Sequence, residues 1–115
     1  MRLRALLGHG VTVQGAAWQD VEITGLATDS REVGPGMLFA ALPGSRLDGA
    51  AFIPEALARR AAAVLADASY SGGELRVPLI LDPHPRRRLA LLAASFYGKQ
   101  PRCVVEVTVI IEVVA

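Results

Sequence analysis

Three unbroken apolar runs of strand length, at residues 37–42, 63–66 and 77–81, constrain the fold of this chain more than any other feature. A strand with one face in water alternates apolar and polar residues, whereas an apolar run without alternation is typical of a strand buried on both faces. Segments with helical periodicity follow these runs. Strands that alternate with helices predict an α/β layered domain built around a mixed, mostly buried sheet.

Two segments, residues 51–60 and 86–97, carry apolar residues at the spacing of an amphipathic helix. Pro54 falls in the first turn of the first segment, where proline is tolerated. The apolar stripes consist of Ile53, Ala56 and Leu57 in the first segment and of Leu89, Leu92, Ala93 and Phe96 in the second. Shorter elements are expected as a helix at 3–7 and as strands at 11–13, 21–27 and 104–114.

Length and charge restrict the class of protein. A chain of 115 residues, 52% hydrophobic, fits one compact domain. Its net charge of +1 gives no general attraction to nucleic acid or to an anionic membrane. The apolar stretch at residues 3–7 is too short for a signal peptide, and no window approaches a membrane span of about 18 residues. The single cysteine, Cys103, indicates a small buried side chain in a reducing compartment. We therefore expect a cytoplasmic protein with neither nucleic acid nor membrane as partner.

The motifs of self-contained enzymes are absent from the sequence. It contains no P-loop, no G-x-G-x-x-G and no paired Cys or His at metal-ligand spacing. His9 and His84 lie far apart among Gly and Pro residues, which favours surface loops for both. None of the serines lies in a nucleophile elbow. We expect no catalytic residue and no metal site in this chain.

The first candidate site is the polar segment Thr28–Arg31, which follows a predicted strand. In open α/β sheets, ligands bind in the crevice beyond the carboxyl ends of the strands. Hydroxyl groups and backbone N–H groups there suit a pyrimidine edge or a phosphate. Arg31 either holds Asp29 in place or meets an anionic ligand. The alternative is an Asx turn in which Asp29 only caps its own backbone.

The second candidate site is the segment Gly44–Gly49, which also lies between a strand and a helix. Its glycines allow a backbone to approach a ligand closely, and Arg46 offers a guanidinium that matches a phosphate. Asp48 is read as a turn or N-cap residue. An ordinary connecting loop is the alternative.

A third basic feature, Arg86–Arg88, lies at the start of a predicted helix. The N-terminus of a helix is itself positive, so cations are not favoured there. A solvated face is the preferred interpretation, with an anion or nucleic-acid site as the alternative.

Taken together, the two loops resemble the N-terminal, UDP-binding domain of the Mur ligases. The resemblance rests on D-S-R at 29–31, P-G at 35–36 and L-F at 38–39 followed by Gly44, and it extends over residues 20–108. It continues through Asp48-Gly49, Phe52-Ile53, Ala56, the run 61–65 and Phe96-Tyr97-Gly98. The last of these motifs is more similar to the E-type ligase of the family than to the F-type.

The resemblance implies a binding role for particular residues. Thr28 and Ser30 would meet the uridine end of UDP-N-acetylmuramoyl-dipeptide from the first loop, with Asp29 and Arg31 in support. Ser45, Arg46 and Leu47 would meet the same uridine end from the second loop, with Gly44 allowing the approach and Asp48 in support. ATP and Mg²⁺ are the cofactors of the full-length family, and none is expected in this chain.

The sequence departs from the family after Thr108, where the phosphate loop G-T-N-G-K-T is replaced by an apolar tail at residues 109–115. We expect a nucleotide-sugar-binding domain at 1–108, in a truncated, frame-shifted or excised chain that is not catalytic alone. Apolar residues occupy every odd position from 103 to 115, so self-association through residues 104–115 is a second hypothesis. The N-terminal domain of an F-type ligase is a third.

Overall fold

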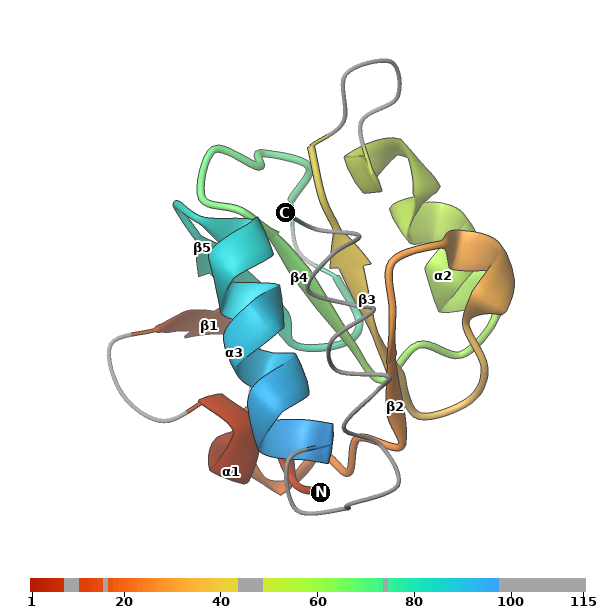
Figure 1. The fold of residues 1–115 in the computed structure, drawn as a ribbon. Helices are drawn as coiled ribbons and strands as arrows, with labels where there is room; N and C mark the ends of the chain where they lie inside the picture. Colours follow the sequence, from red (N-terminus) through yellow and green to blue (C-terminus); the bar gives the residue numbers. More distant parts are fainter. Residues whose placement is uncertain (8–10, 16, 44–48, 74, 98–115) are drawn as a thin grey trace.

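A five-stranded sheet forms the centre of the computed structural model, which describes residues 1–7, 11–15, 17–43, 49–73 and 75–97 (Figure 1). The strand order is β1-β5-β4-β3-β2, with β1 antiparallel to β5 and every other pair parallel. The strands are β1 (Thr12–Gln14), β2 (Gly25–Ala27), β3 (Met37–Ala41), β4 (Ala63–Asp67) and β5 (Leu79–Asp82). The helices are α1 (Leu3–Leu7), α2 (Ile53–Ala58) and α3 (Pro85–Tyr97), with 3-10 turns η1 (Trp18–Asp20), η2 (Ser30–Glu32) and η3 (Gly49–Phe52).

The central strands are buried on both faces, as the unbroken apolar runs predict. Leu38 to Ala41 in β3 and Ala63 to Ala66 in β4 are all buried. These two strands pair in parallel with Phe39 opposite Val64. Side chains of a strand alternate between its faces, so each of these strands supplies two separate cores.

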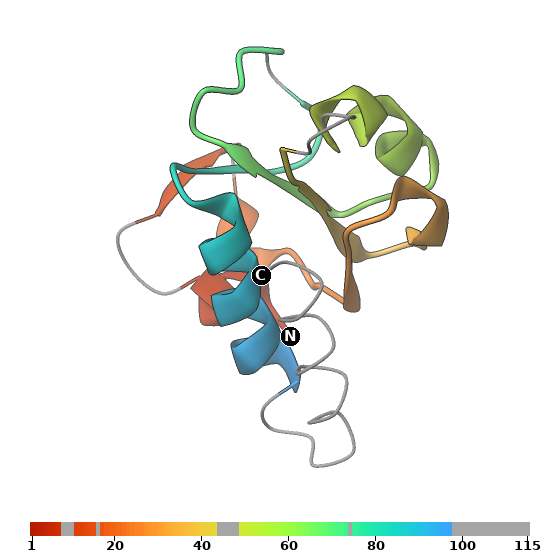
Figure 2. The ribbon, with the colours of Figure 1, turned by 45° about the horizontal axis from the view of Figure 1, so that its top comes forward.

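Helices cover both faces of the sheet, and Figure 2 shows α3 and α2 on opposite sides of it. One core joins α1 and α3 to the sheet through Leu38 and Leu65. The other core joins α2 and the segment after η2 to the sheet through Phe39 and Val64. The predicted α/β layered domain around a mostly buried mixed sheet is therefore confirmed.

The boundaries of several elements differ from the sequence predictions. The strand predicted at 21–27 is confined to Gly25–Ala27, because Glu22 forms only an isolated bridge with Arg2. The helix predicted at 51–60 begins with the 3-10 turn η3, and Arg60 closes it at a left-handed φ of 68°. β5 starts at Leu79, after a proline that has no N–H to offer a ladder. The strand predicted at 104–114, Cys103 and the tail at 109–115 lie outside the described residues.

The parallel strands place four connections at one edge of the sheet. Because β2, β3, β4 and β5 run in the same direction, the residues that follow them all leave at their carboxyl ends. This edge, which we call the carboxyl edge, lies at the top of Figure 1, where the chain leaves β3. Both predicted site loops begin there.

Candidate functional site

The first loop, residues 28–31, has a locally fixed backbone. Asp29 has an extended backbone (φ −109°, ψ 124°) and its carboxylate accepts a hydrogen bond from the Arg31 N–H at 2.9 Å, which caps η2. The Arg31 guanidinium also binds this carboxylate, with Nη2 at 2.7 Å from Oδ2. The loop therefore contains an Asx turn, and Arg31 holds Asp29 in place, which is one of the two roles predicted for it.

This pair also sets the charge of the loop. The side-chain hydrogen bonds from Arg31, helped by its backbone N–H, lower the pKa of Asp29 to about 2. The same contact raises the pKa of Arg31. The carboxylate is thus ionised throughout the neutral range. The Arg31 side chain is 79% exposed, so its outer edge faces solvent at the carboxyl edge.

Ser30, in the same loop, is buried. Its hydroxyl donates a hydrogen bond to Oε1 of Glu55, in the first turn of α2. Glu55 is half-buried and also lies 3.9 Å from Nε of Arg59. The Glu55 carboxylate thus links α2, the helix after the second loop, to the first loop.

The first loop and the base of the second loop line a common cavity of about 560 Å³, which we call the first cavity. Leu42, which precedes Pro43, and Gly49 lie on either side of the segment 44–48, and both line the cavity with Phe52 and Glu55. The N–H of Gly49 binds the Leu42 carbonyl at 2.9 Å and closes the base. A Cβ at Gly49 would fall 2.6 Å from backbone atoms of Leu42, so this closure requires glycine. The volume is in the range of ligand pockets, roughly 300 to 1,000 Å³.

The remaining predicted residues are placed as follows. Thr28 and Ser30 both line the first cavity; Thr28 is exposed and Ser30 is buried. Gly44, Ser45, Arg46, Leu47 and Asp48 lie outside the described residues. Glu55 and Phe52 were not predicted as site residues. An acidic residue in a first helical turn is common for dipole reasons alone, so the sequence offered no signal for Glu55.

A second cavity, of about 490 Å³, lies between the ends of β3 and β4. Ala41, Pro43 and Ala50 line it on one side, and residues 66–67 and 69–72 line it on the other. The base of the second loop therefore lies between two cavities at the same edge. Leu42 and Gly49 line the first cavity, whereas their neighbours Pro43 and Ala50 line the second. The sequence did not predict the second cavity.

The arginine run Arg86–Arg88 is solvated at its first two residues, as expected, and the expectation is wrong only for Arg88. Arg86 and Arg87 are both exposed, and Nη2 of Arg86 donates to the Pro43 carbonyl at 2.7 Å. Nε of Arg88 donates to Oδ2 of Asp82 at 2.8 Å, and both side chains of this pair are largely buried. Burial opposes ionisation of Asp82, but the hydrogen bonds from Arg88 and from the backbone of residue 84 outweigh it and lower its pKa.

Two further features bear on the class of site. Among the described residues, no group of three or more His, Cys, Asp or Glu side chains is placed to hold a metal ion. None of the described helices combines the length and the apolar character needed to cross a membrane. His84 is exposed in the loop after β5, as predicted, and His9 lies outside the described residues.

Fold and site together define an α/β domain with a ligand-sized cavity at the carboxyl ends of parallel strands. The sequence pattern described as "Mur ligase family, catalytic domain" matches residues 22–97. The chain belongs to the Mur ligase family.

The curated relatives agree with this assignment. The chain is 48% identical over 108 residues to the UDP-N-acetylmuramoyl-L-alanyl-D-glutamate–2,6-diaminopimelate ligase of Mesorhizobium japonicum, covering 94% of this chain and 22% of the relative. It is 43% identical to the UDP-N-acetylmuramyl-tripeptide synthetase of Roseiflexus sp., over 89% of this chain and 20% of the relative. The chain thus spans about a fifth of the length of these relatives.

Solved structures resemble the fold. The MurF ligase of Thermotoga maritima in complex with ADP matches with a TM-score of 0.53 and 30% identity, over 69% of this chain and 17% of that chain. A UDP-N-acetylmuramoyl-L-alanyl-D-glutamate–2,6-diaminopimelate ligase matches with a TM-score of 0.67 and 22% identity, over 87% of this chain and 20% of that chain. The second likeness supports the fold alone.

Proposed function

We propose that this chain is the nucleotide-sugar-binding part of an E-type Mur ligase, and that the first cavity holds the uracil end of UDP-N-acetylmuramoyl-dipeptide. The observation that carries the proposal is the meeting of two loops. Residues 28–31 and the base of the second loop, far apart in sequence, line one ligand-sized cavity at the carboxyl edge. This is where open α/β sheets bind their ligands.

The groups on the cavity wall complement a pyrimidine. Uracil presents one N–H donor between two carbonyl acceptors. The Thr28 hydroxyl both donates and accepts, and the carboxylates of Asp29 and Glu55 accept. Phe52 adds an aromatic surface for the ring. Because the described wall carries two carboxylates and one guanidinium, it suits a neutral base better than a diphosphate.

The diphosphate would then be held by the second loop. The resemblance places Ser45, Arg46 and Leu47 at the uridine end, with Gly44 allowing the approach, and the Arg46 guanidinium matches a phosphate; these residues lie outside the described residues. Arg31 offers a further cation at the mouth of the first cavity. A guanidinium beside backbone N–H groups is a common phosphate-binding arrangement.

We propose binding, and not catalysis, as the role of this domain. The sequence contains no Gly-Lys-Thr or Gly-Lys-Ser motif, so it offers no residues that fit the phosphates of ATP or its Mg²⁺. The curated relatives favour the E-type over the F-type and name 2,6-diaminopimelate as the amino acid that they use.

An NMR titration of the ¹⁵N-labelled chain tests the proposal. UDP should shift the amide signals of residues 28–31 and of Gly49, whereas ADP at the same concentration should shift them far less, because it lacks the uracil edge. Binding should be weak, because UDP lacks the muramoyl-dipeptide part of the proposed ligand. If millimolar UDP leaves these signals unchanged, or if ADP shifts them equally, the proposal is wrong.

A matched pair of variants locates the contact. Thr28→Val removes the exposed hydroxyl at nearly constant shape and should weaken UDP binding by about three- to tenfold, the value of one hydrogen bond. Thr12→Val makes the same change on β1, at the far edge of the sheet, and should have no effect. Equal affinities for both variants would remove Thr28 from the site.

A further inference from the structure

The second cavity has the form of a binding site for a polar ring. Three alanines, Ala41, Ala50 and Ala66, line it and leave the ends of β3 and β4 uncovered by larger side chains. Alternate residues along the chain face opposite sides of the second-loop base, so Leu42 lines the first cavity while Ala41 and Pro43 line the second. The two cavities are therefore neighbours: adjacent residues of the same chain segment, Leu42 and Pro43, line one cavity each.

A carboxylate is fixed on the wall of this cavity. Asp67 is the last residue of β4, and its Oδ1 accepts hydrogen bonds from the Ser69 N–H at 2.8 Å and the Ser69 hydroxyl at 2.6 Å. None of the described residues donates to Oδ2. The hydrogen bonds from Ser69 lower the pKa of Asp67, so the carboxylate is ionised at neutral pH. Oδ2 of Asp67 is thus held in place and can accept hydrogen bonds from a ligand.

Hydroxyl groups and an aromatic ring complete the wall. The cavity is lined by Tyr70, Ser71 and Gly72 after the turn at Ser69. Tyr70 packs directly on Gly72, where a Cβ would lie 2.1 Å from the phenol oxygen, so the ring keeps this position only beside glycine. None of the described lining residues is basic. His84 lies close enough to help lower the pKa of Asp67 but does not line the cavity. A carboxylate on a wall whose described residues include no base disfavours an anion, and the polar wall disfavours an apolar ligand.

The chemistry that remains is that of a sugar. A carboxylate at the carboxyl end of a parallel strand binds ribose hydroxyl groups in dinucleotide-binding folds. We propose that the second cavity binds a hydroxyl-bearing sugar ring of the nucleotide sugar, with Oδ2 of Asp67 accepting from its hydroxyl groups. This inference rests on the proposed function, because it places the sugar next to a uracil held in the first cavity.

Two rings of the ligand carry such hydroxyl groups, the ribose and the amino sugar. The experiment compares UDP, 2′,3′-dideoxyuridine diphosphate and UDP-N-acetylmuramic acid on the wild-type chain by ¹⁵N NMR. If the ribose is bound, UDP shifts residues 67–72 and the dideoxy compound binds about tenfold more weakly without these shifts. If the amino sugar is bound, only UDP-N-acetylmuramic acid shifts residues 67–72. Either pattern supports the inference.

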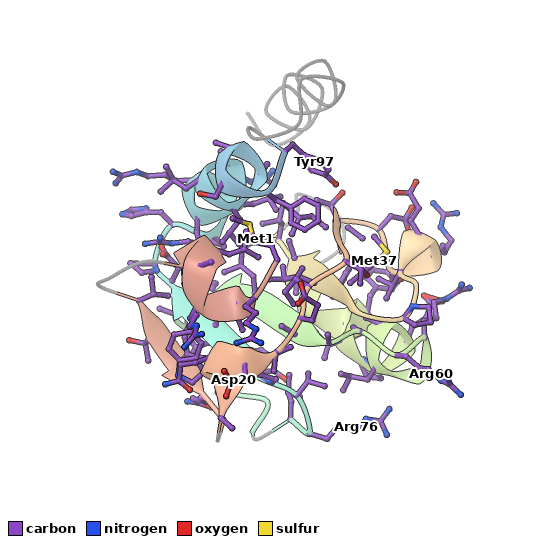
Figure 3. All side chains as sticks on the ribbon, turned by 90° about the horizontal axis from the view of Figure 1, so that it is seen from below. Met1, Asp20, Met37, Arg60, Arg76 and Tyr97 are labelled. Carbon is purple, nitrogen blue, oxygen red and sulfur yellow. The ribbon has the colours of Figure 1, made fainter. Side chains whose placement is uncertain are left out.

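Asp67→Asn provides the protein-side test, because the amide oxygen still accepts from Ser69 while the charged acceptor is lost. It should weaken binding of the sugar-bearing ligand about tenfold. Asp20→Asn is the matched control: Asp20 is an exposed acid on the side seen in Figure 3, away from the carboxyl edge. It should bind like the wild type.

The outcomes separate the two proposals. Shifts at residues 28–31 without shifts at 67–72, together with unchanged affinity of Asp67→Asn, overturn the sugar site and leave the uracil site standing. An absence of shifts at both segments, with all three ligands, overturns the proposed function and the sugar site with it.

Discussion

Replacing Arg88 by methionine should destabilise the domain by about 2 to 4 kcal/mol, because it leaves a largely buried carboxylate without its partner. Nε of Arg88 lies 2.8 Å from Oδ2 of Asp82, and the two side chains are 17% and 12% exposed. Breaking a fully buried pair costs about 3 to 5 kcal/mol, whereas exposed pairs contribute roughly 0 to 1 kcal/mol. The residual exposure and the His84 N–H that still binds Oδ1 place the effect toward the lower part of the buried range.

Urea denaturation followed by the fluorescence of Trp18, the single tryptophan, measures this change. Arg87→Met is the matched control: Arg87 is exposed in the same helical turn, and its loss should change the free energy of unfolding by less than about 0.5 kcal/mol. The double variant Asp82→Asn, Arg88→Met should be more stable than the sum of the single changes predicts, because neither buried charge is then left alone.

The pH dependence gives an independent check. The pKa of Asp82 is lowered in the folded state, so its contribution is present above the unfolded pKa of about 3.9 and is lost as pH falls through the lower folded value. The difference between the wild type and Arg88→Met should therefore shrink below about pH 4. If Arg88→Met matches Arg87→Met at neutral pH, the reasoning about this pair is wrong.

Two further predictions concern the first loop and Gly36, the residue before β3. The NMR signal of the Arg31 amide, which donates to the Asp29 carboxylate, should report the titration of that carboxylate with a midpoint at about pH 2. The ion pair then persists above about pH 4 and is lost as the pH falls toward 2. A midpoint near pH 4 would contradict this. Gly36→Ala should lower the free energy of unfolding by about 1 to 3 kcal/mol, because Gly36 has a φ of 84° and a Cβ there would lie 2.9 Å from Thr24; an unchanged urea midpoint would refute it.

Local patterns predicted the fold well because the interactions that set it are local or periodic. The apolar runs at 37–42 and 63–66 became buried strands, and the helical stripe at 86–97 became α3. The Asp29–Arg31 pair was also within reach, because its partners are two residues apart.

Interactions between distant segments were not predictable from spacing. Ser30 and Glu55 are separated by 25 residues, and they meet only because β2 and β3 pair in register and α2 packs on that face. Arg88 was read as part of a charged run, since the sequence does not show that the first turn of α3 faces the end of β5. The second cavity depends on alanines and a short polar turn, neither of which is distinctive alone.

The central claim is that a uracil ring occupies the cavity between the first loop and the base of the second. Intermolecular NOEs between UDP and the ¹³C-labelled chain test it most directly. We predict contacts from uracil H5 and H6 to the Thr28 methyl group and to the ring of Phe52, which line that cavity. Contacts from these protons to Arg86 and Arg87 instead, with none to Thr28 or Phe52, would contradict the account.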